Sequence, residues 1–342
     1  RVKVRNFTLP PELPPYPMMF DVSQESPLSF FTPMQWEQFR LKIYDELRKN
    51  RIQGDIIYSR ADRIVPIEDI QYRVKHGAAF FNVINYGFFP ENRLQYLDRW
   101  MPEYRKLGIA DKAVMYGLDE RFESEMDKMV NTLSKLKAKY PEIPLLTTAY
   151  TYVSAETNPM NQYIDAWMPT TEKFEEYLPL VRRLQKSGKK VWWYIAFAPF
   201  QPYANFLIET PAPAHRMLMG LQFWKFQSDG FLYYAAVGWR HRDLKTGKTT
   251  SETRYLSGAP IVNYKGAKYY TGVVNGDGAL IYPAESGMVS SIRVKAIRDG
   301  LDDYLYLKLL SQALDNSAAM PETWRQQAAK ELTIEPELVK TL

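Results

Sequence analysis

Short apolar runs alternate with longer amphipathic segments eight times between Pro17 and Leu314. The apolar runs are compact enough to be strands buried on both faces, and the segments between them repeat apolar residues at helix spacing. Strict alternation of this kind predicts a parallel sheet covered by helices, and eight units predict a single-domain α/β fold, the (β/α)8 or TIM barrel. The eight expected strands cover residues 18–22, 56–59, 78–85, 113–118, 144–150, 166–169, 191–197 and 230–237.

An expected helix follows every strand but the fifth, and the pattern changes only after the eighth. The helical segments are 33–49, 67–75, 91–106, 123–139, 173–186, 212–226, 290–298, 301–314 and 321–332. Between 241 and 278 the chain is polar, and the turn sequence 275–278 lies between the apolar runs 272–274 and 280–282. That arrangement predicts a long loop with a hairpin after strand eight. We therefore expect a linker strand over 1–16, a catalytic barrel over 17–314 and a helical extension over 315–342.

Composition excludes several classes of function. The 44 basic and 39 acidic residues are mixed along the chain without a long basic block, so nucleic acid is a poor partner. There is no cysteine, and the three histidines, His76, His215 and His241, lack metal-ligand spacing, so no metal or cofactor is expected. No apolar run reaches the length of a membrane span. A chain that starts at Arg1 looks processed, which fits a secreted, periplasmic or cell-surface protein. The oligomeric state stays open.

Two adjacent carboxylates, Asp119 and Glu120, stand where the fourth strand ends and a helix begins. In a (β/α)8 barrel the carboxyl ends of the strands surround the active site. A neighbouring pair can divide proton donation from charge stabilisation, which is the minimal equipment for cleaving a glycosidic bond. The alternative is structural, because acids commonly open helices, where they cap free amides. Both side chains can reach one pocket only if the backbone leaves strand geometry over 118–121, and Gly117 could permit that bend.

The other strand ends carry amides, acids and aromatic rings. Amides and acids hydrogen-bond to hydroxyls and rings stack on the CH-rich faces of sugars, so this set suits a carbohydrate pocket. Core packing is the competing interpretation for each tryptophan. The positions at strand ends are Asp21, Ser59, Arg60, Asn82, Asn85, Asp119, Glu120, Tyr150, Trp167, Tyr194 and Trp239. Of these we predict Asp119 and Glu120 as catalytic, and Asn82, Asn85, Tyr150, Trp167, Tyr194 and Trp239 as substrate-binding.

The chain resembles the catalytic barrel of glycoside hydrolase family 123, the β-N-acetylgalactosaminidases and their uncharacterised relatives. Five motifs spread in order along most of the chain carry the resemblance. They are Gly-Leu-Asp-Glu at 117–120, Val-Trp-Trp-Tyr-Ile at 191–195, the run 224–234, Gly-Asp-Gly-Ala-Leu-Ile-Tyr-Pro at 276–283 and the run 291–304. Family members usually carry a β-sandwich before the barrel, and residues 2–10 resemble the strand that leaves it.

The resemblance implies retaining, substrate-assisted catalysis. Glu120 would protonate the leaving oxygen, while Asp119 would orient and stabilise the substrate's own 2-acetamido group as its carbonyl attacks the anomeric carbon. A tyrosine would donate to that carbonyl and a tryptophan would form the floor of the pocket; Tyr150, Tyr194 and Trp239 are placed in these roles by their position at strand ends. The acid must be protonated near its working pH, which calls for burial or for the neighbouring negative charge.

Three functions remain open at this stage. The first is an exo-acting β-N-acetylhexosaminidase that removes terminal β-linked N-acetylhexosamine, preferably N-acetylgalactosamine, from glycans or glycolipids. The second keeps the barrel but cleaves a different glycan with two carboxylates, Asp119 acting on water or directly as the nucleophile. The third is a non-catalytic glycan-binding protein on the same fold, since one fold hosts many functions.

Overall fold

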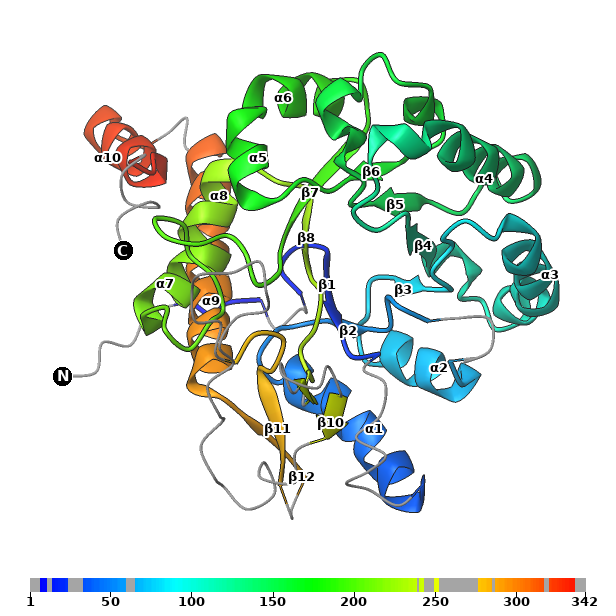
Figure 1. Ribbon diagram of the computed structural model, residues 1–342. Coiled ribbons are helices and arrows are strands. Elements are labelled where there is room, and N and C mark those ends of the chain that lie inside the picture. The colour runs from blue at the N-terminus through cyan, green and yellow to red at the C-terminus, as the bar shows by residue number, and fades with distance from the viewer. Residues whose placement is uncertain are drawn as a thin grey trace.

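Eight parallel strands form a nearly closed barrel in the order β2-β1-β8-β7-β6-β5-β4-β3, which confirms the (β/α)8 prediction (Figure 1). The computed structural model describes residues 7–10, 14–23, 33–59, 65–238, 240–242, 249–251, 276–284, 287–316 and 320–335. The strands are β1 Met18–Asp21, β2 Gly54–Asp55, β3 Phe81–Asn82, β4 Ala113–Gly117, β5 Leu145–Thr147, β6 Ala166–Trp167, β7 Lys190–Ile195 and β8 Gly230–Tyr233. Because all eight are parallel, their carboxyl ends meet at one end of the barrel, which we call the mouth.

Helices surround the sheet and give it its outer layer (Figure 1). They are α1 Pro33–Arg48, α2 Ile67–Lys75, α3 Pro90–Lys106, α4 Met126–Lys139, α5 Thr171–Glu176, α6 Leu178–Lys186, α7 Ala212–Met217, α8 Phe223–Phe226, α9 Ile292–Asp315 and α10 Glu322–Leu332. Short 3-10 turns lie at Ala110–Lys112, Glu123–Glu125, Tyr150–Ser154 and Pro159–Gln162, and a π-helical turn, Leu218–Gln222, joins α7 to α8. Among the described residues no helix is both long and apolar enough to cross a bilayer.

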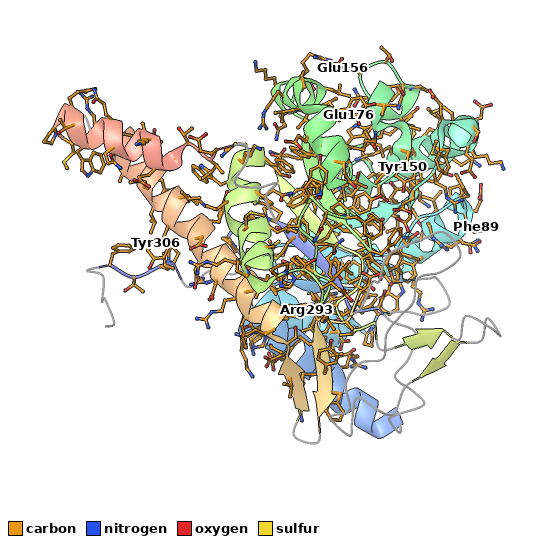
Figure 2. All side chains as sticks on the ribbon, turned by 60° about the vertical axis from the view of Figure 1, so that its left-hand side comes forward. Phe89, Tyr150, Glu156, Glu176, Arg293 and Tyr306 are labelled. Carbon is orange, nitrogen blue, oxygen red and sulfur yellow. The ribbon has the colours of Figure 1, made fainter. Side chains whose placement is uncertain are left out.

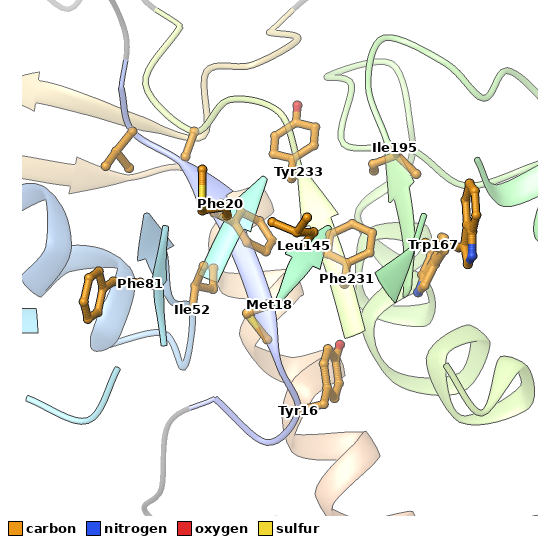
Figure 3. Packing of buried hydrophobic residues seen from close by; sticks show 14 of the residues in the cluster. Tyr16, Met18, Phe20, Ile52, Phe81, Leu145, Trp167, Ile195, Phe231 and Tyr233 are labelled. Atoms are coloured by element: carbon orange, nitrogen blue, oxygen red, sulfur yellow. The ribbon is translucent and has the colours of Figure 1, made fainter. Parts of the chain in front are cut away.

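Successive side chains on each strand point to opposite faces of the sheet, so the apolar residues form two separate cores. On β7, Trp193 packs with the large cluster between sheet and helices, whereas its neighbours Trp192 and Tyr194 belong to the smaller cluster inside the barrel. The same alternation places Phe20, Phe231 and Tyr233 on the helix side (Figure 3). A side chain near the mouth therefore reaches the pocket only when it lies on the interior face of its strand, as Tyr194 does.

Side chains close the barrel between β2 and β3, where the described residues show no strand-to-strand pairing. Gln53 donates from Nε2 to the Phe80 carbonyl (3.2 Å) and accepts from the amide of residue 79 (2.9 Å). Asp55 Oδ2 accepts from the Asn82 amide (2.8 Å). Asp55 Oδ1 accepts from Arg73 Nη1 (2.5 Å), and both side chains are buried. These bonds take the place of a backbone ladder along the seam.

Several expected element boundaries differ from those in the structure. The second strand is β2, Gly54–Asp55, rather than 56–59, because the amide of Ile57 donates to Asp21 Oδ1 (2.9 Å) instead of joining a ladder. The two helices expected over 290–298 and 301–314 are one helix, α9. Gly300 lies in its interior because a Cβ there would stand 2.2 Å from the Arg216 carbonyl oxygen. A hairpin that was not expected pairs β11, Ile281–Ala284, with β12, Gly287–Ser290. Residues 272–274 lie outside the described residues, so the hairpin expected across 275–278 stays a prediction.

Candidate active site

The backbone departs from strand geometry directly after β4, as the sequence required for a paired role. Leu118 and Glu120 both adopt left-handed φ values, 51° and 50°, although neither is glycine. Such conformations cost non-glycine residues free energy and persist where the surrounding structure enforces them. Gly117 is needed for another reason than the bend, because a Cβ there would lie 2.7 Å from the Tyr86 ring. The two left-handed residues flank Asp119, so the turn can present consecutive carboxylates to the same side.

Asp119 is held by two hydroxyl groups from the barrel. Tyr116 Oη donates to Asp119 Oδ1 at 2.6 Å, and Thr148 Oγ1 donates to the same oxygen at 2.8 Å. Tyr116 is fully buried and belongs to the interior cluster, and Thr148 follows β5. Two hydroxyl donors that converge on one oxygen fix the position of the Asp119 carboxylate.

Glu120 has a different set of partners. Tyr194 Oη, on the interior face of β7, donates to Glu120 Oε1 at 2.7 Å. Tyr194 Oη also lies 3.5 Å from Tyr150 Oη, and the Glu120 amide donates to Thr148 Oγ1 at 3.2 Å. Burial, followed by the charge of Glu120, raises the pKa of Tyr194 far above its usual value. Tyr194 therefore keeps its proton and remains a donor at any physiological pH.

Both carboxylates are open to solvent, while the groups that hold them are buried. Asp119 and Glu120 are exposed, whereas Tyr116 and Tyr194 are buried. Across the described part of the chain neither acid takes part in an ion pair. The burial expected for the acid is thus absent from the free chain, and a substrate that covers the mouth has to supply the exclusion of water.

Tyr150 and Tyr194 lie beside the acid pair, but the remaining predicted residues are placed differently. Asn82 is buried, accepts from the Tyr116 amide (2.8 Å) and donates to the Ile56 carbonyl (2.8 Å), so its amide is committed to the protein. We propose for it a positioning role. Asn85 is half-buried and donates to the Ile57 carbonyl (3.3 Å), and its substrate-binding role stays a prediction.

The two tryptophans do not join the pair in the described residues. Trp167 is fully buried in the cluster on the helix side of the sheet, and its Nε1 donates to Asn161 Oδ1 (3.3 Å) (Figure 3). Its parity on β6 directs it away from the interior, so we propose a packing role. Trp239 lies outside the described residues, and its role stays a prediction.

Sequence reasoning missed Tyr116 and Thr148, the two groups that hold Asp119. Tyr116 has the parity of an interior residue, and it stands three positions before Asp119. Thr148 directly follows the strand next to β4 in the sheet. The sequence could have indicated both residues, because each is a polar side chain close to the carboxyl end of one of two neighbouring strands.

Two further carboxylates lie near strand ends at the mouth, one at the end of β1 and one in a turn that contacts the residue after β8. Asp21, the last residue of β1, is fully buried and accepts from Ser23 Oγ (2.6 Å); burial raises its pKa to about 7. Asp277 accepts from Tyr234 Oη (2.7 Å), and burial raises its pKa to about 6. Burial, then the charges of Asp119, Asp21 and Glu120, raise the pKa of Tyr58. The tyrosine hydroxyls at the mouth thus stand among several acids. Within the described residues no group of three acids or histidines could hold a metal ion.

Comparisons with known proteins agree with the barrel fold. The family model described as glycoside hydrolase 123, catalytic domain, matches residues 36–310. None of the curated proteins matches the chain in sequence. Among solved structures, a family 123 glycoside hydrolase from Clostridium perfringens, analysed for glycolipid glycan hydrolysis, aligns with a TM-score of 0.59 and 13% identity. That alignment covers 96% of this chain and 70% of the Clostridium chain. An inosine 5'-monophosphate dehydrogenase from Legionella pneumophila aligns over 77% of this chain and 78% of its own, at 12% identity. Its TM-score of 0.36 is too low to indicate a shared fold.

Proposed function

The chain belongs to glycoside hydrolase family 123, and from that premise we propose that it removes terminal β-linked N-acetylhexosamine, N-acetylgalactosamine in preference, from glycans or glycolipids. Membership makes it a glycosidase of carbohydrate substrates. The substrate and the mechanism are our proposal, supported above all by one observation. Two consecutive carboxylates reach the same mouth, each with its own buried tyrosine donor.

The different partners of the two acids suit different steps. Asp119 accepts two hydroxyl hydrogen bonds on one oxygen, and these bonds hold the carboxylate in a fixed position at the mouth. In the proposed reaction it orients the substrate's 2-acetamido nitrogen and stabilises the positive charge that develops as the acetamido oxygen attacks the anomeric carbon. The carbon–oxygen bond to the leaving group breaks, and an oxazolinium-type intermediate remains in the pocket.

Glu120 supplies the proton in the same scheme. Its carboxyl transfers a proton to the leaving oxygen, and the resulting carboxylate then takes a proton from the water that opens the intermediate, so the anomeric configuration is retained. Tyr194 can only donate to Glu120, because its pKa is far above the working range. The bond stabilises the carboxylate form that exists between the two proton transfers.

Turnover of aryl glycosides by paired variants tests the proposal. The substrates are 4-nitrophenyl and 2,4-dinitrophenyl N-acetyl-β-galactosaminide, together with the glucosaminide. For Glu120→Gln we expect kcat to fall by about 10²- to 10⁴-fold with the more basic 4-nitrophenolate leaving group, and clearly less with dinitrophenolate, which leaves without protonation. Asp119→Asn should lose activity to a similar extent with both. Glu123→Gln alters an exposed acid just beyond the pair and is the matched control.

Three results would contradict parts of the proposal. Full activity in Glu120→Gln would remove Glu120 as the acid. Turnover of 2-hydroxy sugars, without inhibition by a thiazoline mimic of the intermediate, would favour a carboxylate nucleophile, because such mimics bind far more tightly than substrate when the acetamido group takes part. Glycan binding that neither substitution disturbs, in the absence of any turnover, would identify a binding protein.

A further inference from the structure

The Gly-Asp-Gly turn at 276–278 has no part in the proposed reaction, yet it is bonded to the mouth of the barrel. The Gly278 amide donates to Tyr233 Oη at 2.9 Å, and the Gly238 amide donates to the Gly278 carbonyl at 2.6 Å. Gly278 has a left-handed φ of 69°, and a Cβ there would stand 2.9 Å from Tyr234 Oη. The turn therefore lies directly against the carboxyl end of β8.

A buried arginine fixes the position of this turn. Arg293, in the first turn of α9, donates from Nη1 to the carbonyls of Phe206 (2.5 Å) and Gly276 (2.7 Å). From Nη2 it donates to the Ala279 carbonyl and to Tyr282 Oη (2.8 Å). Figure 2 shows Arg293 at the end of α9 that adjoins the hairpin of β11 and β12. The carbonyls on both sides of the central residue of the turn are thus tied to one guanidinium.

Asp277, the central residue of the turn, carries an acceptor that the protein does not use. Its Oδ2 accepts from Tyr234 Oη at 2.7 Å, whereas its Oδ1 has no hydrogen-bond partner in the described part of the chain. A shielded acceptor without a donor costs free energy, which a hydroxyl group bound there would recover. Tyr234 spends its only hydroxyl proton on Asp277, so its oxygen remains an acceptor as well. Both residues are half-buried, and part of each stays open to solvent.

These two residues lie across the barrel from the acid pair. β4, which leads to Asp119 and Glu120, and β8, which leads to Tyr234, are four places apart in the order of eight strands. Tyr58, three residues after β2, lies between them, because its ring meets the Tyr116 ring edge-on at 6.1 Å between centroids. Burial raises the pKa of Tyr234, and the nearby Tyr58 adds to that rise. Neighbouring side chains therefore connect the two sides of one pocket.

The position opposite the acid pair corresponds to a particular end of a bound sugar. In the proposed reaction C1 and C2 of the terminal hexosamine lie at Asp119 and Glu120. C4 stands across the pyranose ring from C1, so the 4- and 6-hydroxyl groups point toward the end of β8. Hydroxyl groups that are covered on binding need hydrogen-bond partners. We infer, on the basis of the proposed function, that Asp277 and Tyr234 bind these hydroxyl groups and thereby recognise the non-reacting end of the sugar.

Deoxygenated substrates combined with substitutions test this role. The substrates are 4-nitrophenyl N-acetyl-β-galactosaminide and its 4-deoxy and 6-deoxy derivatives. For the wild type we expect kcat/KM to fall about 10- to 150-fold with at least one derivative, the range for loss of a hydrogen bond to a charged group. Asp277→Ala should cleave the parent about as slowly as the wild type cleaves that derivative, and its own penalty for deoxygenation should shrink to within about threefold.

Two conservative variants and a control accompany it. Asp277→Asn keeps an acceptor oxygen and should restore part of the penalty. Tyr234→Phe removes a single oxygen and should reduce the penalty several-fold, which provides the test if Asp277→Ala does not fold. Asp229→Asn alters a half-buried acid just before β8, at the opposite end of the barrel, where it accepts from the Val191 amide at 2.9 Å. It should leave the penalty as in the wild type.

The outcomes separate this inference from the proposed function. A wild type that cleaves both deoxy derivatives within about threefold of the parent would overturn the inference and leave the glycosidase intact. A penalty that persists undiminished in Tyr234→Phe and Asp277→Ala would also overturn it, because the hydroxyl groups would then be bound elsewhere. If the wild type cleaves no N-acetylhexosaminide and does not bind the thiazoline, the proposed function fails, and this inference fails with it.

Discussion

Replacing Tyr116 by Phe is the sharpest test of how the acid pair is built. The substitution removes one oxygen, and with it the 2.6 Å donor to Asp119 Oδ1, while Thr148 keeps the second donor at 2.8 Å. A hydrogen bond to a charged group is worth about 1.5–3 kcal/mol. If that stabilisation supports the positively charged transition state through Asp119, kcat should fall about 10- to 150-fold. KM should change little, because no group that binds the substrate directly has been removed.

A second buried tyrosine on the other side of the same turn provides the control. Tyr86 is also fully buried and also donates one hydrogen bond, to the Leu146 carbonyl at 2.9 Å, but it does not touch either acid. Tyr86→Phe should lower the free energy of unfolding about as much as Tyr116→Phe does, and should leave kcat within about threefold. Steady-state kinetics on 4-nitrophenyl N-acetyl-β-galactosaminide and urea unfolding measure the two quantities. A Tyr116→Phe protein that is folded and retains wild-type kcat would refute the reasoning.

Three further substitutions follow from the same contacts. Tyr194→Phe removes the donor to Glu120 and should lower kcat about tenfold, since the carboxylate left after proton transfer loses a charge-assisted bond; unchanged kcat would argue against it. Gly117→Ala places a methyl group 2.7 Å from the Tyr86 ring, so thermal unfolding should show a loss of about 1–3 kcal/mol and kcat should fall with it. For Asp21 the pKa rises from 3.8 to about 7 on folding, so the wild type loses stability as pH rises from 4 to 7. Asp21→Asn escapes this loss, and its advantage in unfolding free energy should grow to roughly 4 kcal/mol by pH 8; an advantage independent of pH would contradict the burial argument.

The sequence predicts the barrel well because alternation of strand and helix repeats eight times and each unit reinforces the next. It predicts the mouth for the same reason, since strand ends are visible as points where apolar runs stop. What it cannot supply is the parity of each side chain, because a shift of one residue in strand register moves a side chain to the other face. Trp167 illustrates this: it stands at a strand end, yet lies fully buried on the helix side. The early end of β2 has a similar cause. The Ile57 amide donates to the Asp21 carboxylate on another strand instead of to a neighbouring strand's backbone, and this contact depends on the tertiary structure.

Asn82 connects two features that are usually independent. Its amide group donates to the Ile56 carbonyl across the gap between the first and last strands of the sheet order, and its oxygen accepts from the backbone of Tyr116 on the strand that delivers the acids. The side-chain amide of Asn82 therefore helps both to close the barrel between β2 and β3 and to position the strand that leads to Asp119 and Glu120. The architecture and the chemistry of this enzyme are coupled at that point, so neither can be remodelled there without altering the other.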